Sequence, residues 1–455
     1  MKFNSNELSD FARYYGFHYD CCSPEVIIQD FMLDAQRGLR GEESYMMMIP
    51  SYIKPESSTG SGKTVLALDA GGTNFRGALV SFDKTGKAVT QNTIKTYMPG
   101  SRGRVSAKDF YNAIADVCEP LLKNASCDVH GIGFCFSYGV KITEDGDAYP
   151  EVFSKEIDAP EVLGKPLGKA VIEVLKSRGV KTPERIILLN DTTAALLTGV
   201  ASVPARFPSK LSQDGLPAKD EYGVPAGPII GLILGTGFNI AYPEKVIPKI
   251  GYNSDKPQIM VTEAGNLYFR YRGILDKRFD SLTKAPGMYS TEKALSGAYL
   301  GDLSLIIFKQ AIKDGVLSFE KQEEILAMEN LQTRDLNAFL HAPLSRATSF
   351  GALFGTGEVD AAASVYYLAS IVTERAALLT ASLTAAAAIK ASEDYNPMSP
   401  VRIAVEGTTY QIYHCMKEAF ESRLRDILAT AGTRYAIVTP VEQASLIGAA
   451  VAALT

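Results

Sequence analysis

The sequence predicts an α/β fold built from two domains. Short apolar runs with the length of strands alternate with helix-length segments, a pattern typical of α/β proteins. The 455 residues exceed what one hydrophobic core usually supports, so two domains are expected. The segments "LALDAGGTNFRGALV" and "IGLILGTGFNIAY" share a pattern of strand, Gly/Thr turn, Asn and strand. This internal similarity indicates a duplicated architecture whose two halves face a common ligand.

The composition is that of an ordinary globular protein, with 46% hydrophobic and 21% charged residues. The net charge of -5 argues against a general nucleic-acid binder, although backbone dipoles can bind phosphate without net positive charge. The six cysteines form no Cys-x-x-Cys pair and the four histidines are scattered, so a structural zinc site is not expected. A reducing cytoplasm is the expected location.

No membrane partner is expected. The N-terminal residues lack the apolar core of a signal peptide. The most apolar helical run, "AALLTASLTAAAAI", is shorter than the ~20 residues of a membrane span, and Arg375 and Lys390 flank it. It predicts a helix buried inside the protein.

The elements follow in a regular order. "SPEVIIQDFMLDAQRGL" predicts a helix with Ser23 as the N-cap and Pro24 at the first helical position. "TVLALDA" and "RGALVSF" flank "GGTNF" and predict a β-hairpin, and residues 230–242 predict a second one. A helix over residues 106–123 is expected, followed by buried strands in "VHGIGFCFS" and "RIILLND".

Two glycine-rich stretches compete for the role of phosphate site. The first, Gly60 to Thr64, matches the end of a nucleotide-binding P-loop, but the full pattern requires a glycine where this chain has Ser57. A P-loop also follows a strand and opens a helix, whereas this stretch follows a loop and opens a strand. It is therefore expected to be an exposed linker.

The second stretch, Gly71-Gly72-Thr73-Asn74, is the better phosphate candidate. Two glycines allow a tight turn whose amide groups can point at anionic oxygens. Thr73 adds a hydroxyl donor, Arg76 adds a cation, and Asp69 is a candidate for holding Mg²⁺ through water. A plain hairpin turn explains the glycine pair equally well by itself. The second hairpin favours the phosphate site, because two such turns would clasp the β- and γ-phosphates from opposite sides.

"LLNDTTAALLTG" places Asn190 and Asp191 where a strand ends and a helix begins. Taken alone, Asp191 is best explained as the N-cap of that helix. The functional alternative is a carboxylate at the carboxyl end of a strand, where α/β sheets bind ligands. There it would accept a proton from a hydroxyl that attacks a γ-phosphate.

Together these segments resemble the eukaryotic-type hexokinase family from about Val65 onward, in the expected order. The two glycine hairpins are similar to its phosphate hairpins, "GIGFCFSYGV" to its sugar segment and "LLNDTTAALL" to its catalytic aspartate segment. "VTEAGNL" and "TEKALSGAYLGD" resemble the two carboxylate segments of the sugar pocket, and "AVEGTTYQIYHCMKEAF" the adenosine segment. The resemblance implies the actin-like ATPase (ribonuclease H-like) duplicated fold, with two unequal domains and a central cleft.

Residue by residue, the resemblance makes Asp191 the general base for the 6-hydroxyl of a hexose, with Lys155 and Arg76 also in the catalytic set. The implied ligands of the sugar are Ser137, Ser154, Lys155, Asn190, Asp191, Asn239, Glu263 and Glu292. The implied surroundings of the nucleotide phosphates and Mg²⁺ are Asp69, Gly71, Gly72, Thr73, Asn74, Arg76, Gly235, Thr236 and Gly237. Gly407, Thr408 and Thr409 are implied to lie by the adenosine and α-phosphate.

The chain also departs from the family pattern. It has no tryptophan, and Ala264 follows Glu263 where the family usually shows one. Ser154 replaces a threonine but keeps its hydroxyl, Gly139 replaces a proline, and Glu406 replaces an aspartate. The missing tryptophan opens space near the sugar pocket, so the sequence leaves the preferred hexose open.

The expected smaller domain comprises residues 64–189 and 443–455, and the larger one comprises residues 1–63 and 190–442. The expected function is transfer of the γ-phosphoryl of Mg-ATP to the 6-hydroxyl of a hexose, with glucose first and mannose or fructose as further candidates. The alternatives are a sugar sensor of weak or no catalysis, and an actin-like ATPase without a sugar. A monomer and a homodimer are equally compatible with the sequence.

Overall fold

The structure is a computed structural model of the chain. It describes residues 2–55, 61–84, 87–153, 157–201, 227–392, 399–432 and 434–455.

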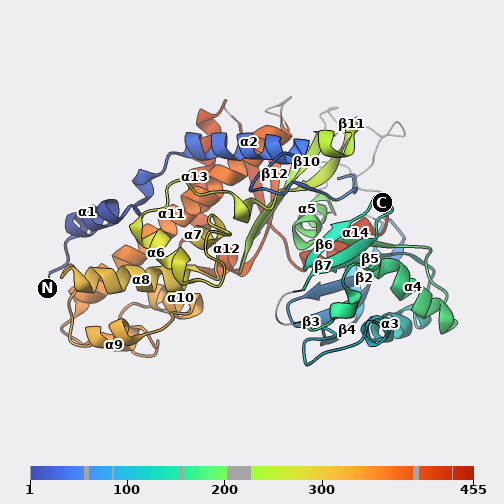
Figure 1. The fold of residues 1–455 in the computed structure, drawn as a ribbon, viewed down its shortest axis with the longest axis horizontal. Coiled ribbons are helices and arrows are strands. Elements are labelled where there is room, and N and C mark those ends of the chain that lie inside the picture. The colour runs from blue at the N-terminus through green and yellow to red at the C-terminus, as the bar shows by residue number, and fades with distance from the viewer. Residues whose placement is uncertain are drawn as a thin grey trace.

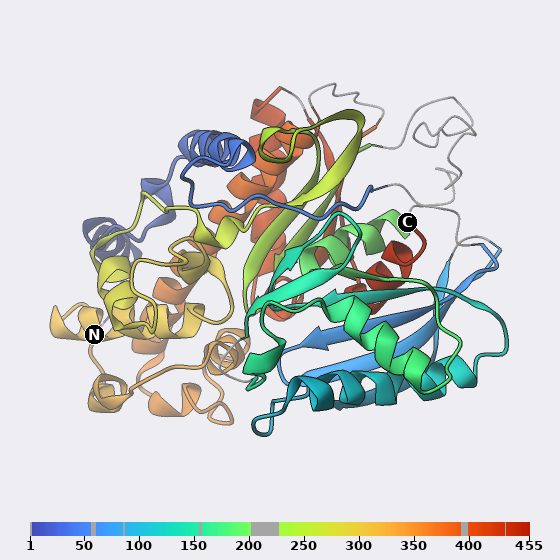
Figure 2. The ribbon, with the colours of Figure 1, turned by 45° about the vertical axis from the view of Figure 1, so that its right-hand side comes forward.

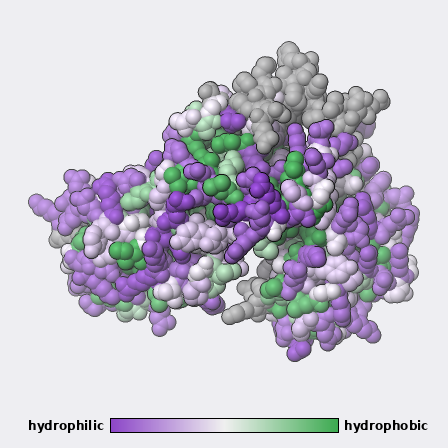
Figure 3. Space-filling model, turned by 45° about the horizontal axis from the view of Figure 1, so that its top comes forward, coloured by the Kyte–Doolittle hydropathy of each residue, from purple (hydrophilic) through white to green (hydrophobic). Residues whose placement is uncertain are grey.

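The chain forms two lobes around two β-sheets (Figure 1). The N-terminus lies at the far end of the helix-rich lobe, and the C-terminus lies beside the lobe that holds β2 to β5 (Figure 1). In the space-filling view the outline is indented between the lobes, and hydrophobic residues on this face occur in small groups among hydrophilic ones (Figure 3). This shape agrees with the predicted cleft between two lobes.

The strands are β1 Ile49–Pro50, β2 Thr64–Gly71, β3 Asn74–Phe82, β4 Ala88–Tyr97, β5 Val129–Phe136, β6 Gly139–Ile142, β7 Ala148–Val152, β8 Ile186–Leu189, β9 Ile229–Leu234, β10 Phe238–Ile247, β11 Tyr252–Val261, β12 Val401–Glu406 and β13 Ala436–Pro440. The α-helices are α1 Ser5–Tyr15, α2 Pro24–Arg40, α3 Ala107–Lys123, α4 Leu167–Ser177, α5 Asp191–Ala201, α6 Ile274–Leu282, α7 Glu292–Leu295, α8 Leu300–Lys313, α9 Gln322–Ala327, α10 Thr333–His341, α11 Val359–Ala391, α12 Thr408–Ile412, α13 Met416–Thr430 and α14 Ala444–Ala452. Short 3-10 turns are η1 Tyr19–Cys21, η2 Pro160–Val162, η3 Pro248–Ile250, η4 Ala264–Asn266 and η5 Gly351–Leu353.

The two sheets repeat one topology. The five-stranded sheet has the order β4-β3-β2-β5-β8, with antiparallel pairing from β4 to β2 and parallel pairing from β2 to β8. The six-stranded sheet contains the same series as β11-β10-β9-β12-β13, with β1 added at the edge beside β11. Both predicted hairpins and the predicted duplication are confirmed.

Local sequence signals explain several of these elements. Strand β2 is buried along nearly its whole length, as its continuous apolar run predicts. Helix α2 begins as expected, because the side chain of Ser23 accepts a hydrogen bond from the amide of Val26 and Pro24 occupies the first turn. Ser106 caps α3 in the same way by accepting from the amide of Asp109.

Helices α5 and α14 lie between the two sheets, and α3 and α4 cover the outer face of the five-stranded sheet (Figure 2). The packing of α14 is close: a Cβ on Gly133 of β5 would lie 1.8 Å from the carbonyl oxygen of Ala449. A Cβ on Gly448 would lie 2.2 Å from the carbonyl oxygen of Ala194 in α5. The C-terminal helix therefore packs on the first sheet, as expected, although the exact domain limits stay a prediction.

Helix α11 runs through the core of the helix-rich lobe. It has 33 residues and is long and apolar enough to cross a membrane, but 94% of its most apolar window is buried inside the protein. Arg375, also buried in this helix, pairs with Asp276 of α6 at 2.7 and 2.8 Å, so its charge is compensated. The predicted burial is confirmed for residues 376–388, Ile389 is partly buried, and the helix is longer than the predicted run.

Candidate active site

The P-loop-like stretch has the geometry of a hairpin edge. Ser61 and Gly62 are exposed, and the amide of Gly62 donates to the carbonyl oxygen of Phe82 at the end of β3. Thr64 then begins β2 and not a helix. The expectation of an exposed linker is confirmed for Ser61 and Gly62, whereas Lys63 is half-buried, Thr64 is buried, and Gly60 lies outside the described residues.

The turn between β2 and β3 is open. Gly72 has φ of +57°, a conformation that favours glycine, and a Cβ placed on it would meet no atom within 4 Å. A Cβ on Gly71 would meet only the Oγ of Ser137, at 3.9 Å. The hydroxyl of Tyr138 donates to the carbonyl oxygen of Gly72 at 2.5 Å and joins the turn to the end of β5. Thr73 and Asn74 are exposed at this turn, so an anion can reach both.

Arg76 is paired with Asp69 across the same hairpin. Its Nε and Nη2 donate to Oδ2 of Asp69 at 2.8 and 2.5 Å, and its Nη2 also lies 3.3 Å from the Oγ of Ser445 in α14. Asp69 is largely buried, which strengthens the pairing. The charge of Arg76, the cation predicted to bind the phosphates, is thus partly neutralised by Asp69, the carboxylate predicted to bind Mg²⁺.

The second turn, Gly235-Thr236-Gly237, is packed against other segments. The carbonyl oxygen of Gly235 accepts hydrogen bonds from the amide of Gly297 at 2.8 Å and from Oγ1 of Thr409 at 2.7 Å. The carbonyl oxygen of Thr236, an exposed residue, accepts a hydrogen bond from the amide of Ala298 at 3.0 Å. The turn is therefore joined to the segment after α7 and to α12.

Gly407 lies directly against the strand that leads into this turn. It has φ of +137°, and a Cβ on it would lie 2.2 Å from the carbonyl oxygen of Leu234. Thr408 follows in an exposed position at the start of α12. The structure thus brings the predicted adenosine segment and the second predicted phosphate turn together.

Asn190, and not Asp191, caps helix α5. The Oδ1 of Asn190 accepts from the amide of Thr193 at 2.9 Å, while Asp191 is the first residue of the helix. The interpretation of Asp191 as the N-cap, favoured by its local sequence alone, is wrong because the neighbouring asparagine takes that role. Oδ1 of Asp191 accepts the Thr192 hydroxyl at 3.2 Å, and the carboxylate also takes hydrogen bonds from the backbone of Asp191 and Thr192 at the start of the helix.

The sugar-pocket residues from the second half of the chain form a connected group. Nδ2 of Asn239 donates to Oε1 of Glu263 at 2.7 Å, and the Glu263 amide donates back to Oδ1 of Asn239 at 3.0 Å. Oε2 of Glu292 accepts from the amide of Phe238 at 2.9 Å. Glu263 has φ of +58°, an unusual conformation for a residue with a side chain and typical of functional sites.

The electrostatics of the carboxylates are coupled. Burial, opposed by the hydrogen bond from Asn239 and reinforced by the nearby charges of Asp191 and Glu292, raises the pKa of Glu263 to about 7. Burial, with the charge of Asp191, also raises the pKa of Glu292. The pKa of Asp191 is raised by burial and by Asp69, against the Thr192 hydrogen bonds. The charge of Asp191 therefore acts on both sugar-pocket glutamates.

Glu406, at the end of β12, is a site residue that the sequence interpretation missed. Burial, followed by the charge of Asp191, raises its pKa to about 7, and Asp69 contributes in the same direction. Its position in the sequence, at the carboxyl end of a strand and before a glycine, could have indicated a site residue. The sequence pattern places it only in the adenosine segment, because the charges of Asp69 and Asp191 that act on it come from distant parts of the chain.

Ser154 and Lys155 lie outside the described residues, so their predicted roles remain predictions. The described residues contain no group of three or more His, Cys, Asp and Glu side chains arranged to hold a metal ion. Mg²⁺ commonly takes one or two carboxylates and completes its shell with phosphate oxygens and water. The second carboxylate oxygen of Asp69 and the open turn beside it suit that mode of binding.

Two family models, both described as Hexokinase, match the chain over residues 16–201 and 229–455. Hexokinase-1 of Schizosaccharomyces pombe is 25% identical over 444 residues, which cover 92% of this chain and 85% of the relative. Hexokinase-5 of Oryza sativa subsp. japonica is 26% identical over 454 residues, 94% of this chain and 85% of the relative. A hexokinase of Schistosoma mansoni solved with glucose shares the fold, with a TM-score of 0.70 at 21% identity, over 99% of this chain and 100% of that chain.

Proposed function

The chain belongs to the hexokinase family and catalyses the ATP-dependent phosphorylation of a hexose, and from this premise we propose which residues perform each step. The proposed hexose is glucose, the sugar named with the Schistosoma mansoni structure. The reaction takes place between the two glycine turns and the carboxylate group of Asp191, Glu263 and Glu292. The observation that carries the assignment is Asp191, a carboxylate that does not cap its helix and whose charge acts on both sugar-pocket glutamates.

Asp191 is the proposed general base. Because Asn190 caps α5, the carboxylate of Asp191 is not needed for the helix terminus and can accept the proton of the sugar 6-hydroxyl. As that proton leaves, the oxygen forms a bond to the γ-phosphorus, and the bond from the γ-phosphorus to the ADP oxygen breaks. The raised pKa of Asp191 makes it a stronger base than an exposed aspartate.

The sugar is held by groups that the structure has already oriented. Glu263 and Glu292 present carboxyl oxygens to sugar hydroxyls, and Asn239 fixes Glu263 through two hydrogen bonds. Ser137 and Asn190 complete the described part of the pocket, and Ser154 and Lys155 are proposed to join it. Several fixed acceptors suit a polyol, since each hydroxyl needs a partner when it leaves water.

The phosphates are proposed to lie between the two turns. The open Gly71-Gly72-Thr73 turn offers amide groups and the Thr73 hydroxyl to the terminal phosphates. Gly407 and Thr408 are proposed to contact the α-phosphate and adenosine. Mg²⁺, when bound to the phosphates near Asp69, would neutralise the charge that develops on their oxygens. The chain's own contribution is positioning and charge stabilisation, with closure of the lobes around the sugar to exclude water.

A coupled assay of ADP release tests the proposal. Glucose, mannose, fructose and N-acetylglucosamine are compared at saturating Mg-ATP, and glucose is expected to have the highest kcat/KM. Sugar-independent ATP turnover would contradict the assignment of the sugar pocket. The assay also tests the Mg²⁺ requirement, because chelation should abolish turnover. The cytoplasmic location remains part of this proposal and is checked by imaging the tagged protein.

A further inference from the structure

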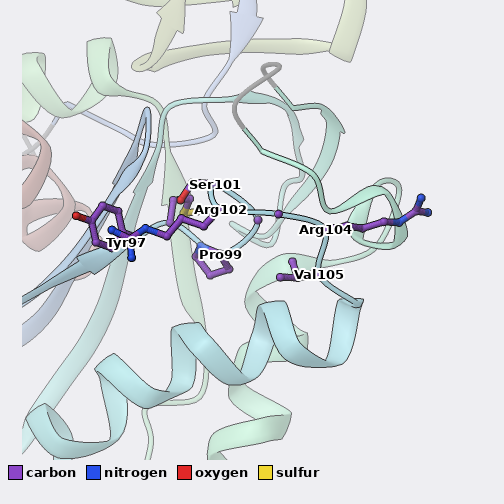
Figure 4. Close-up of a pocket in the computed structure, with 9 residues that line it drawn as sticks. Tyr97, Pro99, Ser101, Arg102, Arg104 and Val105 are labelled. Carbon is purple, nitrogen blue, oxygen red and sulfur yellow. The ribbon is translucent and has the colours of Figure 1, made fainter.

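The loop between β4 and α3 forms an open pocket of about 320 Å³, lined by residues 97–105 (Figure 4). This loop is attached to the first glycine turn. The amide of Met98 donates to the carbonyl oxygen of Thr73 at 2.9 Å, and Tyr97 is the cross-strand partner of Asn74. Any group bound at the Gly71–Gly72 turn therefore has this loop as its immediate neighbour.

The strand register places several side chains of the hairpin on one face. Asp69 pairs with Arg76, and Arg76 in turn pairs with Lys95. Residues directly opposite each other, and residues two apart in a strand, share a face of the sheet. Asn74 and Tyr97 are therefore on the same face as the Asp69–Arg76 ion pair, the face that meets Ser445 of α14.

Arg102 lies over this face. Its guanidinium carbon is 3.3 Å from the centroid of the Tyr97 ring, and Figure 4 shows its side chain directed toward Tyr97 while Arg104 points the opposite way. Within the described part of the chain, neither Arg102 nor Lys95 forms an ion pair. The ring holds the guanidinium in place without neutralising its charge.

The charge of the phosphate site requires such a cation. Arg76 donates two hydrogen bonds to Asp69, so part of its charge is already compensated. Asp191 and Glu406 add further carboxylates close to Asp69. A triphosphate that enters this region brings negative charge beside Asp69, and Arg76 can balance that charge only in part. Ser101 adds a hydroxyl oxygen that is buried and has no hydrogen-bond partner in the described structure.

We propose that Arg102, held on Tyr97, is a second cationic contact for the triphosphate of the nucleotide, with Lys95 as a weaker third. This inference rests on the proposed placement of the phosphates at the Gly71–Gly72 turn. It assigns a nucleotide-binding role to the loop of residues 98–105, which lies outside both glycine motifs. Arg102 contributes to substrate binding and not to proton transfer, so its loss should affect the nucleotide and spare the sugar.

The test compares Arg102→Gln with the matched control Arg104→Gln, because both substitutions remove one charge from the same loop. Arg102→Gln is expected to raise the KM for Mg-ATP about tenfold, the effect of losing one charge-assisted contact. The KM for glucose and kcat should change less than twofold. Arg104→Gln should leave all three constants unchanged. Lys95→Gln should raise the KM for Mg-ATP about threefold.

Binding and stability measurements make the result decisive. Calorimetric titration with the non-hydrolysable analogue AMP-PNP and Mg²⁺ should show the same tenfold weakening for Arg102→Gln, with an unchanged midpoint of thermal unfolding. Equal nucleotide affinities for the Arg102 and Arg104 variants would overturn the inference. So would a change confined to inhibition by hexose 6-phosphate, since that would assign the loop to the product. Absence of wild-type turnover with every hexose would instead count against the proposed function.

Discussion

The two glycine turns are alike in sequence but differ in what surrounds them. The turn at Gly71–Gly72 is open, and a Cβ on either glycine would meet no atom closer than 3.9 Å. The turn at Gly235 is fastened by Gly297 and Thr409, and Gly407 packs against the strand that precedes it. One duplicated hairpin thus leaves room for a ligand, while the other organises the segments around it.

The difference separates two uses of glycine. In the first turn the missing side chain keeps space and amide groups available to phosphate oxygens. Beside the second turn, at Gly407, the missing side chain allows two backbone segments to touch, as the 2.2 Å distance from its built Cβ to the Leu234 carbonyl oxygen demonstrates. Substitutions in the first region should therefore affect catalysis, and substitutions in the second should affect stability.

The largest expected effect is the loss of turnover when Asp191, the proposed base that serves the phosphates held by both turns, is replaced. Asp191→Ala should lower kcat by about 10³-fold or more, because the 6-hydroxyl loses its proton acceptor. Glucose affinity, measured by calorimetry, should change by less than about threefold, since Glu263 and Glu292 remain. Near-normal turnover would show that the two turns do not present the phosphate to Asp191.

Gly407→Ala and Gly71→Ala test the contrast between the regions directly. Gly407→Ala should destabilise the protein by about 3 kcal/mol, because its methyl group overlaps a backbone carbonyl and its φ is strained. Gly71→Ala should change the free energy of unfolding by less than about 0.5 kcal/mol. Its methyl group should nevertheless raise the KM for Mg-ATP, since it occupies space at the phosphate turn. Chemical denaturation measures the change in the free energy of unfolding for both variants. Equal destabilisation by both substitutions would contradict the contrast.

Thr73→Ala and Lys63→Ala compare the proposed phosphate turn with the P-loop-like stretch before it. Thr73→Ala should raise the KM for Mg-ATP about tenfold through loss of one hydroxyl contact to a charged oxygen. Lys63 follows the exposed Gly62 at the hairpin edge, so Lys63→Ala should leave steady-state kinetics within twofold of wild type. The reverse result would move the phosphate site to residues 60–64.

The smallest expected effect is on the pH dependence of stability, through the buried side chain of Glu263. The folded protein keeps Glu263 protonated up to a pKa of about 7, against 4.5 for an ordinary glutamate. The unfolded chain binds fewer protons between these values, so stability falls as the pH rises from about 4.5 to 7. Glu263→Gln should remove part of this fall. Its unfolding midpoint should drop about 2 °C less than that of wild type between pH 5 and pH 8.

The matched control is Glu144→Gln, which alters an exposed glutamate of the loop between β6 and β7. It should follow the wild-type pH dependence of the unfolding midpoint. If the pH profile of Glu263→Gln coincided with those of wild type and Glu144→Gln, burial of Glu263 would be excluded as a cause of the fall in stability with pH.

Much of the fold was predictable because its signals are local. The alternation of strands and helices, the Ser23 cap and both hairpins depend on residues a few positions apart, and the structure confirms them. The cap of α5 was mistaken because Asn190 and Asp191 are both good caps, and only the folded backbone decides between them. Glu406 was missed because its neighbours Asp69 and Asp191 lie hundreds of positions away in the sequence.

The sequence by itself determined the α/β class, the duplicated hairpins and the order of the motifs, since each follows from side-chain periodicity and the freedom of glycine within a short segment. Only the tertiary structure decided that one turn stays open while the other is closed by Gly297, Gly407 and Thr409. It also decided that Arg76 is held by Asp69 and that Arg102 lies beside the open turn. These properties depend on which distant segments meet when the sheets pack around α5 and α14, and no local pattern records that contact.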